Sequence, residues 1–162
     1  MSNPKIRREP LYVVRTSGIH GRGVFAARRI RKGTRIVEYT GERIDNDEAD
    51  RRYDENGMKR HHTFLFTLDK KTVIDGAIKR GGGDASYINH SCEPNCEAVI
   101  TGKRIYVHAL ETIEPGTELA YDYQYVRTGE NDKALEKFYV CRCGAPNCRR
   151  TIMKPAKKRR RP

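Results

Sequence analysis

The sequence predicts a mainly β fold with one or a few short helices. About eight short runs are rich in β-branched and aromatic residues, turn residues recur roughly every ten positions, and a single segment has clear helix signals. The 162 residues suit one domain, and 33% charged against 36% hydrophobic residues indicates a modest core under a very polar surface. No apolar run approaches the ~18 residues that span a bilayer, so we expect neither a membrane protein nor a secretory signal.

The first expected elements are three strands and a helix. The strands fall at residues 11–14, 23–26 and 35–39, the second of them after the glycine-spaced segment 20–23. Asp45 can cap the helix, Glu48 follows three positions later as in a capping box, and Gly57 can end it. Its many charges place this helix at the surface.

Further strands are expected later in the chain, at residues 64–68, 72–75, 98–100, 104–107 and 118–121. The three consecutive glycines at 81–83 are predicted to form a flexible connector. No internal repeat is present at a period of 20–50 residues.

The net charge of +12 is concentrated at the two ends. Residues 1–8 hold three basic residues and residues 154–162 hold six, with no acid in either segment, so the residues between carry only +3. Blocks of like charge stay solvated, which predicts flexible arms. Such arms suit nucleic acid, a nuclear-import peptide or simple solubility, and the sequence leaves these readings open.

Five cysteines point to a metal site. Cys141, Cys143 and Cys148 lie within eight residues in the pattern C-x-C-G-x-x-x-C. An odd cysteine number argues against a disulfide framework, whereas closely spaced thiolates are typical zinc ligands. A tetrahedral zinc needs a fourth ligand, and either Cys92 or Cys96 can supply it.

Three other clusters are not explained by core packing. Residues 21–23, Gly-Arg-Gly, form a tight loop that either lets backbone approach a ligand or is an ordinary turn. Residues 89–95, Asn-His-Ser-Cys-Glu-Pro-Asn, are unusually rich in donors for a simple loop. Tyr121 and Tyr123 place two phenols on the same side of an expected strand, although plain β propensity also explains them.

Together these motifs resemble a SET-domain protein lysine methyltransferase with a zinc-binding post-SET segment. The similarity runs from about residue 11 to residue 152 and rests on the motifs at residues 20–25, 38–42, 88–95, 118–123 and 141–149, in the family's order. Within the family the chain is most similar to the trithorax and mixed-lineage-leukaemia class. Its short build resembles a bacterial or viral version, or an excised domain.

The resemblance implies a pseudoknotted β-fold, with S-adenosylmethionine on one face and the target lysine entering a narrow channel from the other. It divides the chain into a basic arm (1–9), a SET domain (10–126), a zinc-bound post-SET segment (127–153) and a basic tail (154–162). The cofactor-binding residues that it implies are His20, Gly21, Arg22, Gly23, Phe64, Asn89, His90 and Ile152. It selects Cys92 to complete the zinc site with Cys141, Cys143 and Cys148, and leaves Cys96 as a small buried residue or free thiol.

The resemblance assigns the chemistry to three tyrosines. Tyr123 matches the family's catalytic tyrosine, Tyr39 lines the channel, and Tyr121 stands where the family has either Phe or Tyr. Lysine is almost wholly protonated at pH 7, so a dry channel beside a sulfonium must lower its pKa before the amine can attack. A tyrosine at position 121 can hold a water and restrict space, which implies mainly monomethylation.

Two positions depart from the family's pattern. Phe64 stands where close relatives carry a tyrosine that touches the cofactor, which implies weaker cofactor binding. Ser86 and Tyr87 stand where relatives usually have Arg-Phe, which implies that a salt link is absent there. Neither change removes a residue that the chemistry needs.

The implied activity is methylation of a histone tail or another basic protein. The alternatives are a catalytically idle, zinc-stabilised binding module and a nucleic-acid-binding protein that acts through its basic tail. The resemblance implies an intracellular protein, at chromatin in the nucleus if the chain is eukaryotic or host-targeted and in the cytoplasm if it is bacterial.

Overall fold

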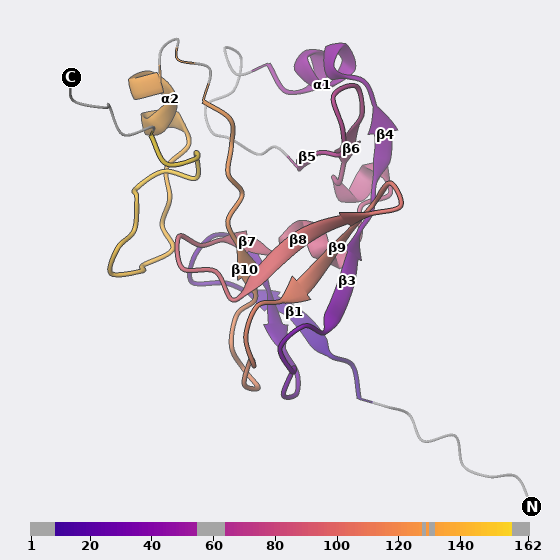
Figure 1. The fold of residues 1–162 in the computed structure, drawn as a ribbon, viewed down its shortest axis with the longest axis vertical. Helices are drawn as coiled ribbons and strands as arrows, with labels where there is room; N and C mark the ends of the chain where they lie inside the picture. The colour runs from indigo at the N-terminus through magenta and orange to yellow at the C-terminus, as the bar shows by residue number, and fades with distance from the viewer. Residues whose placement is uncertain (1–8, 55–63, 128, 130–131, 157–162) are drawn as a thin grey trace, which may run out of the picture.

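The computed structural model is built from short strands in four small sheets, with two α-helices (Figure 1). It describes residues 9–54, 64–127, 129 and 132–156. The prediction of a mainly β fold with few short helices is therefore confirmed. Both basic arms fall largely outside the described residues, as does Gly57, the expected end of the first helix.

The strands are β1 (Tyr12–Thr16), β2 (Arg22–Ala26), β3 (Arg35–Tyr39), β4 (Glu42–Ile44), β5 (Leu65–Thr67), β6 (Val73–Asp75), β7 (Asn89–His90), β8 (Cys96–Thr101), β9 (Arg104–Ala109) and β10 (Ala120–Tyr121). The helices are α1 (Asn46–Arg52) and α2 (Asp132–Phe138), with two short 3-10 helices, η1 (Ile78–Arg80) and η2 (Asp84–Tyr87). The sheets have the orders β1-β2, β3-β9-β8, β4-β6-β5 and β10-β7.

The pairing of β7 with β10 is the connection that matters most for function. In the four sheets of the described chain, this is the strand pair that runs parallel, whereas the other pairs are antiparallel. It aligns Ala120 with Asn89 and Tyr121 with His90. Parallel neighbours cannot be joined by a tight turn, so the intervening chain forms the β8-β9 hairpin before it returns. This crossing brings residues 89–92 beside residues 121–123.

The main core lies between the β1-β2 and β3-β9-β8 sheets. Val24, Ile105, Val107 and Leu119 are fully buried there. A second, smaller cluster is formed by Tyr139, Cys141, Ile152 and Met153 in the C-terminal part of the chain. In Figure 1 the chain segment that follows β10 runs through the middle of the molecule. The C-terminal part with α2 lies on one side of this segment, and α1 and β5 lie on the other.

Helix α1 begins as the sequence predicts and ends earlier. The side chain of Asp45 accepts a hydrogen bond from the N–H of Glu48 at 2.8 Å, which is an N-cap. The Glu48 carboxylate instead pairs with Arg52 at 2.6 Å, one turn on. The helix ends at Arg52, because Tyr53 leaves the helical conformation as its C-cap.

The expectation of a flexible connector at residues 81–83 is wrong. Gly81 caps η1 with φ of +81°, a left-handed conformation that favours glycine. A Cβ on Gly82 would collide with the backbone carbonyl of Gly76, so this segment is closely packed. The glycines are required by a tight turn and by close backbone approach.

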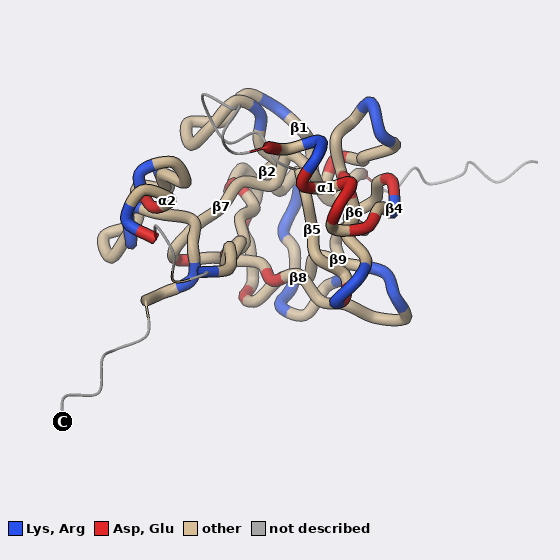
Figure 2. Tube along the Cα trace, turned by 90° about the horizontal axis from the view of Figure 1, so that it is seen from above, with Lys and Arg blue, Asp and Glu red and all other residues tan. Residues whose placement is uncertain are grey.

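Acidic and basic residues are distributed over several faces of the trace (Figure 2). Acidic residues are prominent along α1, where Asp47 and Glu48 lie in the first turn. No helix within the described ranges has the length and apolar character needed to cross a membrane.

Candidate functional site

A groove of about 1170 Å³ runs between α1 and β5 on one side and the C-terminal segment on the other. Most of the residues that the sequence singled out lie along it: His20, Gly21, Arg22, Tyr39, Phe64, Asn89, His90, Tyr121, Tyr123, Cys141 and Ile152. These residues come from segments up to 132 positions apart, so the fold and not the local sequence assembles them.

The side chain of Asn89 holds the loop between β1 and β2 in place. Its side-chain amide nitrogen lies 3.3 Å from the carbonyl oxygen of His20 and 3.0 Å from that of Arg22. The same nitrogen lies 3.1 Å from Ser17 Oγ and 2.8 Å from Glu118 Oε1. The Asn89 side chain therefore supports the loop, which leaves the loop's groove-facing surface open to a ligand.

Two further features shape this loop. Gly21 has φ of +48°, so the turn requires glycine. Gly23 is not among the residues that line the groove, and a Cβ there would collide with the Glu118 carboxylate. The guanidinium of Arg22 lies 4.9 Å from the ring centroid of Tyr87, a cation–π contact that a phenylalanine at position 87 would also permit.

Three phenols meet at the floor of the groove. Tyr121 lies between the other two rings: its centroid is 5.0 Å from that of Tyr123 and 6.1 Å from that of Phe66, which contacts Tyr39 at 5.4 Å. The Tyr39 hydroxyl donates to the carbonyl oxygen of Phe64 at 2.6 Å. Phe64 thus contributes its backbone as well as its ring to the site.

The hydroxyls of Tyr123 and Tyr121 differ in their partners. The Tyr123 hydroxyl donates to the carbonyl oxygen of Ile88 at 2.6 Å. The Tyr121 hydroxyl has no hydrogen-bond partner among the residues that the structure describes. Among the described residues, Tyr121 is therefore the one phenol of the three whose hydroxyl proton has no acceptor.

All three phenols stay protonated at neutral pH. Burial above all raises the pKa of Tyr39, Tyr121 and Tyr123, and the neighbouring phenols raise it further. None of them can therefore serve as a phenolate base near pH 7. Their contribution must come from hydrogen bonding and from the shape of the site.

His90 is a buried neutral imidazole in the wall between the phenols and the cysteines. Burial lowers its pKa to about 4, with a further lowering by the Arg149 charge and an opposing effect of Asp122. Its Nδ1 accepts a hydrogen bond from the backbone N–H of Tyr123 at 3.0 Å. The ring also packs edge-on against the Tyr123 ring, with centroids 5.3 Å apart.

Four cysteines form a candidate metal centre. The sulfur atoms of Cys92, Cys141, Cys143 and Cys148 all lie within 4.8 Å of one another. The Cys92 sulfur is 3.8 Å from that of Cys141, which matches the edge of about 3.8 Å in a tetrahedron with Zn–S bonds of about 2.3 Å. Cys96 is buried in β8 outside this group, as a free thiol.

The surroundings of the sulfurs suit thiolates. Each sulfur accepts at least one backbone N–H at 3.4–3.5 Å. The contacts are Arg149 N–H to Cys92, Cys143 N–H to Cys141, Cys92 N–H to Cys143, and Arg150 N–H to Cys148. Burial raises the pKa of the Cys92 and Cys141 thiols, whereas N–H groups of Cys92 and Ala145 outweigh burial at Cys143 and lower its pKa to about 6. A donor set of this kind fits zinc.

Sequence reasoning missed several residues of the groove. Tyr125 and Tyr139 lie along it with ring centroids 4.9 Å apart, and Phe138 packs edge-on against Tyr139 at 5.0 Å. The ion pair between Arg149 and Asp122 at 2.8 Å joins the C-terminal segment to the strand that carries the phenols. The aromatic spacing of Tyr121, Tyr123 and Tyr125 is a signal that would have extended the site.

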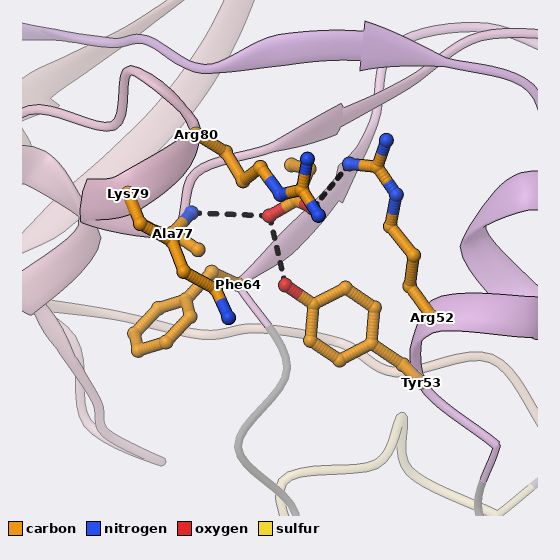
Figure 3. A pocket seen from close by; sticks show the side chains of 7 residues that line it. Arg52, Tyr53, Phe64, Ala77, Lys79 and Arg80 are labelled. Atoms are coloured by element: carbon orange, nitrogen blue, oxygen red, sulfur yellow. Dashed lines mark hydrogen bonds and ion pairs between the residues drawn. The ribbon is translucent and has the colours of Figure 1, made fainter.

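A second pocket, of about 410 Å³, adjoins the groove and shares Tyr53 and Phe64 with it. Its centre is the fully buried Asp75, which accepts hydrogen bonds from the Tyr53 hydroxyl at 2.8 Å, Arg52 at 2.9 Å and the Ala77 N–H at 3.1 Å (Figure 3). Burial raises the pKa of Asp75, but these donors lower it below its ordinary value. Asp75 thereby fixes the end of α1, one wall of the groove.

Comparison with known proteins agrees with this geometry. The SET domain family matches residues 21–124. The histone-lysine N-methyltransferase, H3 lysine-4 specific, of Saccharomyces cerevisiae is 40% identical over 150 residues, which cover 88% of this chain and 13% of that protein. The protein of the same description from Emericella nidulans is 41% identical over 152 residues, covering 90% of this chain and 12% of that protein.

The histone-lysine N-methyltransferase trr of Drosophila melanogaster is 40% identical over 147 residues, covering 88% of this chain and 6% of that protein. The chain thus spans a small fraction of the length of these relatives. The family match nevertheless takes in well over half of the chain and includes Tyr39, Tyr121, Tyr123 and Cys92. This chain belongs to the SET-domain family.

Proposed function

We propose that this chain transfers a methyl group from S-adenosylmethionine to the ε-amine of a protein lysine. The proposal rests on the convergence of Tyr39, Tyr121 and Tyr123 in one groove. The hydroxyls of Tyr39 and Tyr123 donate hydrogen bonds to backbone carbonyls. This is a rigid, weakly polar site without a charged side chain among the three. It suits a reaction that depends on placing an uncharged amine.

Histone H3 is the proposed substrate, and lysine-4 is the proposed position. The relatives from Saccharomyces cerevisiae and Emericella nidulans carry this specificity in their names. A histone tail is a basic, extended segment, and Asp50 of α1, which lines the groove, provides an opposite charge there. The proposed reaction would then take place on chromatin.

The amine must reach the methyl donor uncharged. Lysine has an ordinary pKa of about 10.4, and removal from water disfavours its ammonium form. Because the three phenols stay protonated, the proton leaves to solvent before transfer and not to a side chain of the site. The new N–C bond forms as the S–C bond of the donor breaks, and the electron pair of that bond stays on sulfur.

Tyr39 and Tyr123 orient the reacting atoms. Each hydroxyl gives its proton to a carbonyl, of Phe64 and Ile88 respectively, so its oxygen lone pairs face the groove as acceptors. Acceptors at fixed positions can align the N–H groups of the amine and the polarised hydrogens of the methyl group. Fixed positioning and preorganised dipoles of this kind supply most of the rate enhancement in such transfers.

Tyr121 is proposed to limit the product mainly to monomethyl-lysine. Its hydroxyl has no partner among the described residues, so it can hold a water molecule or the incoming amine. A water held there occupies the space that a second methyl group would need. This proposal concerns only the number of methyl groups added to one lysine and leaves the transfer step unchanged.

The β1-β2 loop is proposed to hold the methyl donor, which supplies the activated methyl group when it is bound. Gly21 lines the groove in a left-handed turn, and the side chain of Asn89 holds the carbonyls of His20 and Arg22 in place. Phe64 and Ile152 are proposed to contact the donor from the groove wall. The role of these residues is to bind and orient the donor.

Zinc is proposed to be held by Cys92, Cys141, Cys143 and Cys148, where its part is structural. The four ligands come from two segments 49 residues apart, so a bound ion would tie the post-SET segment to the loop after β7. That segment forms one wall of the groove. A structural ion here would therefore maintain the groove without joining the reaction.

The proposal is tested with an H3 tail peptide and a matched peptide in which arginine replaces lysine-4. Incubation with S-adenosylmethionine should add one methyl mass to the first peptide and none to the second. Methylation of both peptides would confirm the transferase and refute the proposed position. Methylation of neither, while an H3-containing octamer is methylated elsewhere, would refute the position in the same way.

A further inference from the structure

The imidazole of His90 lies between the candidate metal centre and the proposed catalytic tyrosine. It sits on β7, opposite Tyr121 of β10, and only 4% of it is exposed. One ring nitrogen, Nδ1, is 3.0 Å from the backbone nitrogen of Tyr123. The other, Nε2, is 3.5 Å from the sulfur of Cys92.

The contacts determine the tautomer of this ring. The Tyr123 N–H can only donate, so His90 Nδ1 must carry a lone pair, and the ring must be neutral because an imidazolium has no acceptor. The single ring proton is then on Nε2, where it points toward the Cys92 sulfur. A metal-bound thiolate is a good acceptor for such a donor.

The opposite tautomer would break the contact with Tyr123. A proton on Nδ1 would face the Tyr123 N–H, donor against donor, and would turn to the Asp122 carboxylate, whose Oδ1 lies 3.6 Å away. Asp122 is already paired with Arg149 at 2.8 Å, so in the observed arrangement it does not need that proton. The acceptor at Cys92 thus selects the tautomer that holds Tyr123.

We propose that His90 is a positioning residue that links the four-cysteine metal centre to the placement of Tyr123. The inference rests on the proposed roles of the cysteines and of Tyr123. An acceptor sulfur at Cys92 keeps the ring proton on Nε2, and the free Nδ1 then holds the Tyr123 backbone. The metal centre therefore acts on the reaction through one imidazole, besides keeping the post-SET segment in place.

Two substitutions of His90 test its contact with Cys92 and its contact with Tyr123 separately. His90→Asn keeps an acceptor near Nδ1 and loses the donor to Cys92, whereas His90→Gln keeps a donor near Nε2 and loses the acceptor for Tyr123. We expect His90→Asn to release zinc to a chelating dye about 10-fold faster or more, since outer partners of metal ligands have effects of that size. We expect His90→Gln to release zinc more slowly than His90→Asn and to have the lower kcat of the two.

Cys96→Ala is the matched control, because Cys96 is a buried cysteine four residues from Cys92 and outside the metal group. It should release zinc at the rate of the unsubstituted protein. Equal zinc release and equal loss of kcat in the two His90 variants would overturn the link, even if methyl transfer itself is confirmed.

A direct readout does not depend on activity. In the full chain loaded with an NMR-active cadmium isotope, nitrogen-15 spectra should show His90 protonated at Nε2. A scalar coupling should connect that proton to the metal across the N–H···S hydrogen bond. A proton on Nδ1, or no coupling while the Arg149 amide proton shows one, would contradict the proposal whether or not the protein methylates lysine.

Discussion

The hydroxyl of Tyr123 donates a hydrogen bond to the carbonyl oxygen of Ile88 at 2.6 Å. This contact joins two segments 35 residues apart, the turn before β7 and the chain leaving β10, and fixes the phenol at the floor of the groove. The backbone of the same tyrosine is held by His90. Tyr123 is thus anchored at both ends by residues of the 88–92 segment, which also carries Asn89 and Cys92.

Asn89→Ala should weaken both the fold and cofactor binding. The change removes the amide that fixes the carbonyls of His20 and Arg22 and leaves the Glu118 carboxylate without that donor. We expect a loss of about 1–3 kcal/mol in the free energy of unfolding. Isothermal titration calorimetry should show S-adenosylmethionine bound about 10-fold or more weakly, and unaltered binding would show that the loop does not need this support.

Tyr121→Phe should raise the share of dimethyl- and trimethyl-lysine among the products. Removing a hydroxyl that has no partner in the described part of the chain leaves no protein group unsatisfied and frees the space of one water. Mass spectrometry of the peptide product over time measures the three states. A native enzyme that already yields mainly trimethyl-lysine would contradict the role given to Tyr121.

The buried phenols should make stability fall at alkaline pH. Their pKa values are raised in the folded protein, so above about pH 10 the unfolded chain releases protons that the folded chain keeps. The stabilisation is therefore present below pH 10 and is lost as pH rises beyond it. Ultraviolet absorbance should show these phenols ionising only together with unfolding.

Tyr39→Phe provides the comparison for this titration. Its stability difference from the unsubstituted protein should be constant below pH 10 and should shrink above it. Early ionisation of all nine tyrosines in the native protein would mean that the phenols are not shielded.

Cys143→Ser should lose the metal and loosen the C-terminal wall of the groove. The substitution removes one of four ligands, and a structural zinc site contributes its binding free energy to folding. Metal analysis should find less than one zinc per chain, and hydrogen exchange should increase at Tyr139 and Ile152. Cys96→Ser is the control that keeps the four ligands, and equal zinc loss in both variants would argue against the assigned set.

The sequence predicted eight of the ten strands in the described part of the chain, among them the short β5, β6 and β10, and it missed β4, β7 and α2. Residues 35–39 were expected as a strand and form β3 at those bounds, because their content of β-branched and aromatic residues is a local property. Strands β4 and β7, of three and two residues, are too short to show a period, and they exist through partners elsewhere in the chain. The seven-residue helix α2 was also missed, although Ala, Leu, Glu and Lys favour a helix there.

In the candidate site, too, some features follow from sequence spacing and others depend on contacts that only the fold creates. The C-x-C-G-x-x-x-C spacing predicts a metal site by itself, whereas the choice between Cys92 and Cys96 depends on a contact across 49 residues. Geometry separates them, because Cys96 points into the core from β8. Gly82 packs against Gly76, six positions earlier, and a run of three glycines does not reveal this packing, which is why it was mistaken for a flexible segment.

The most direct test of the account is an intact-mass measurement of histone H3 after incubation with the protein and S-adenosylmethionine, with Tyr123→Phe as the control. We predict a gain of one methyl group with the native chain, and a kcat lower by about 100-fold or more in the control, since loss of one preorganised group has effects of that order. Thermal unfolding should show that the control is folded. Equal methylation by a folded Tyr123→Phe protein, or none by the native protein with zinc and cofactor bound, would contradict the central claim.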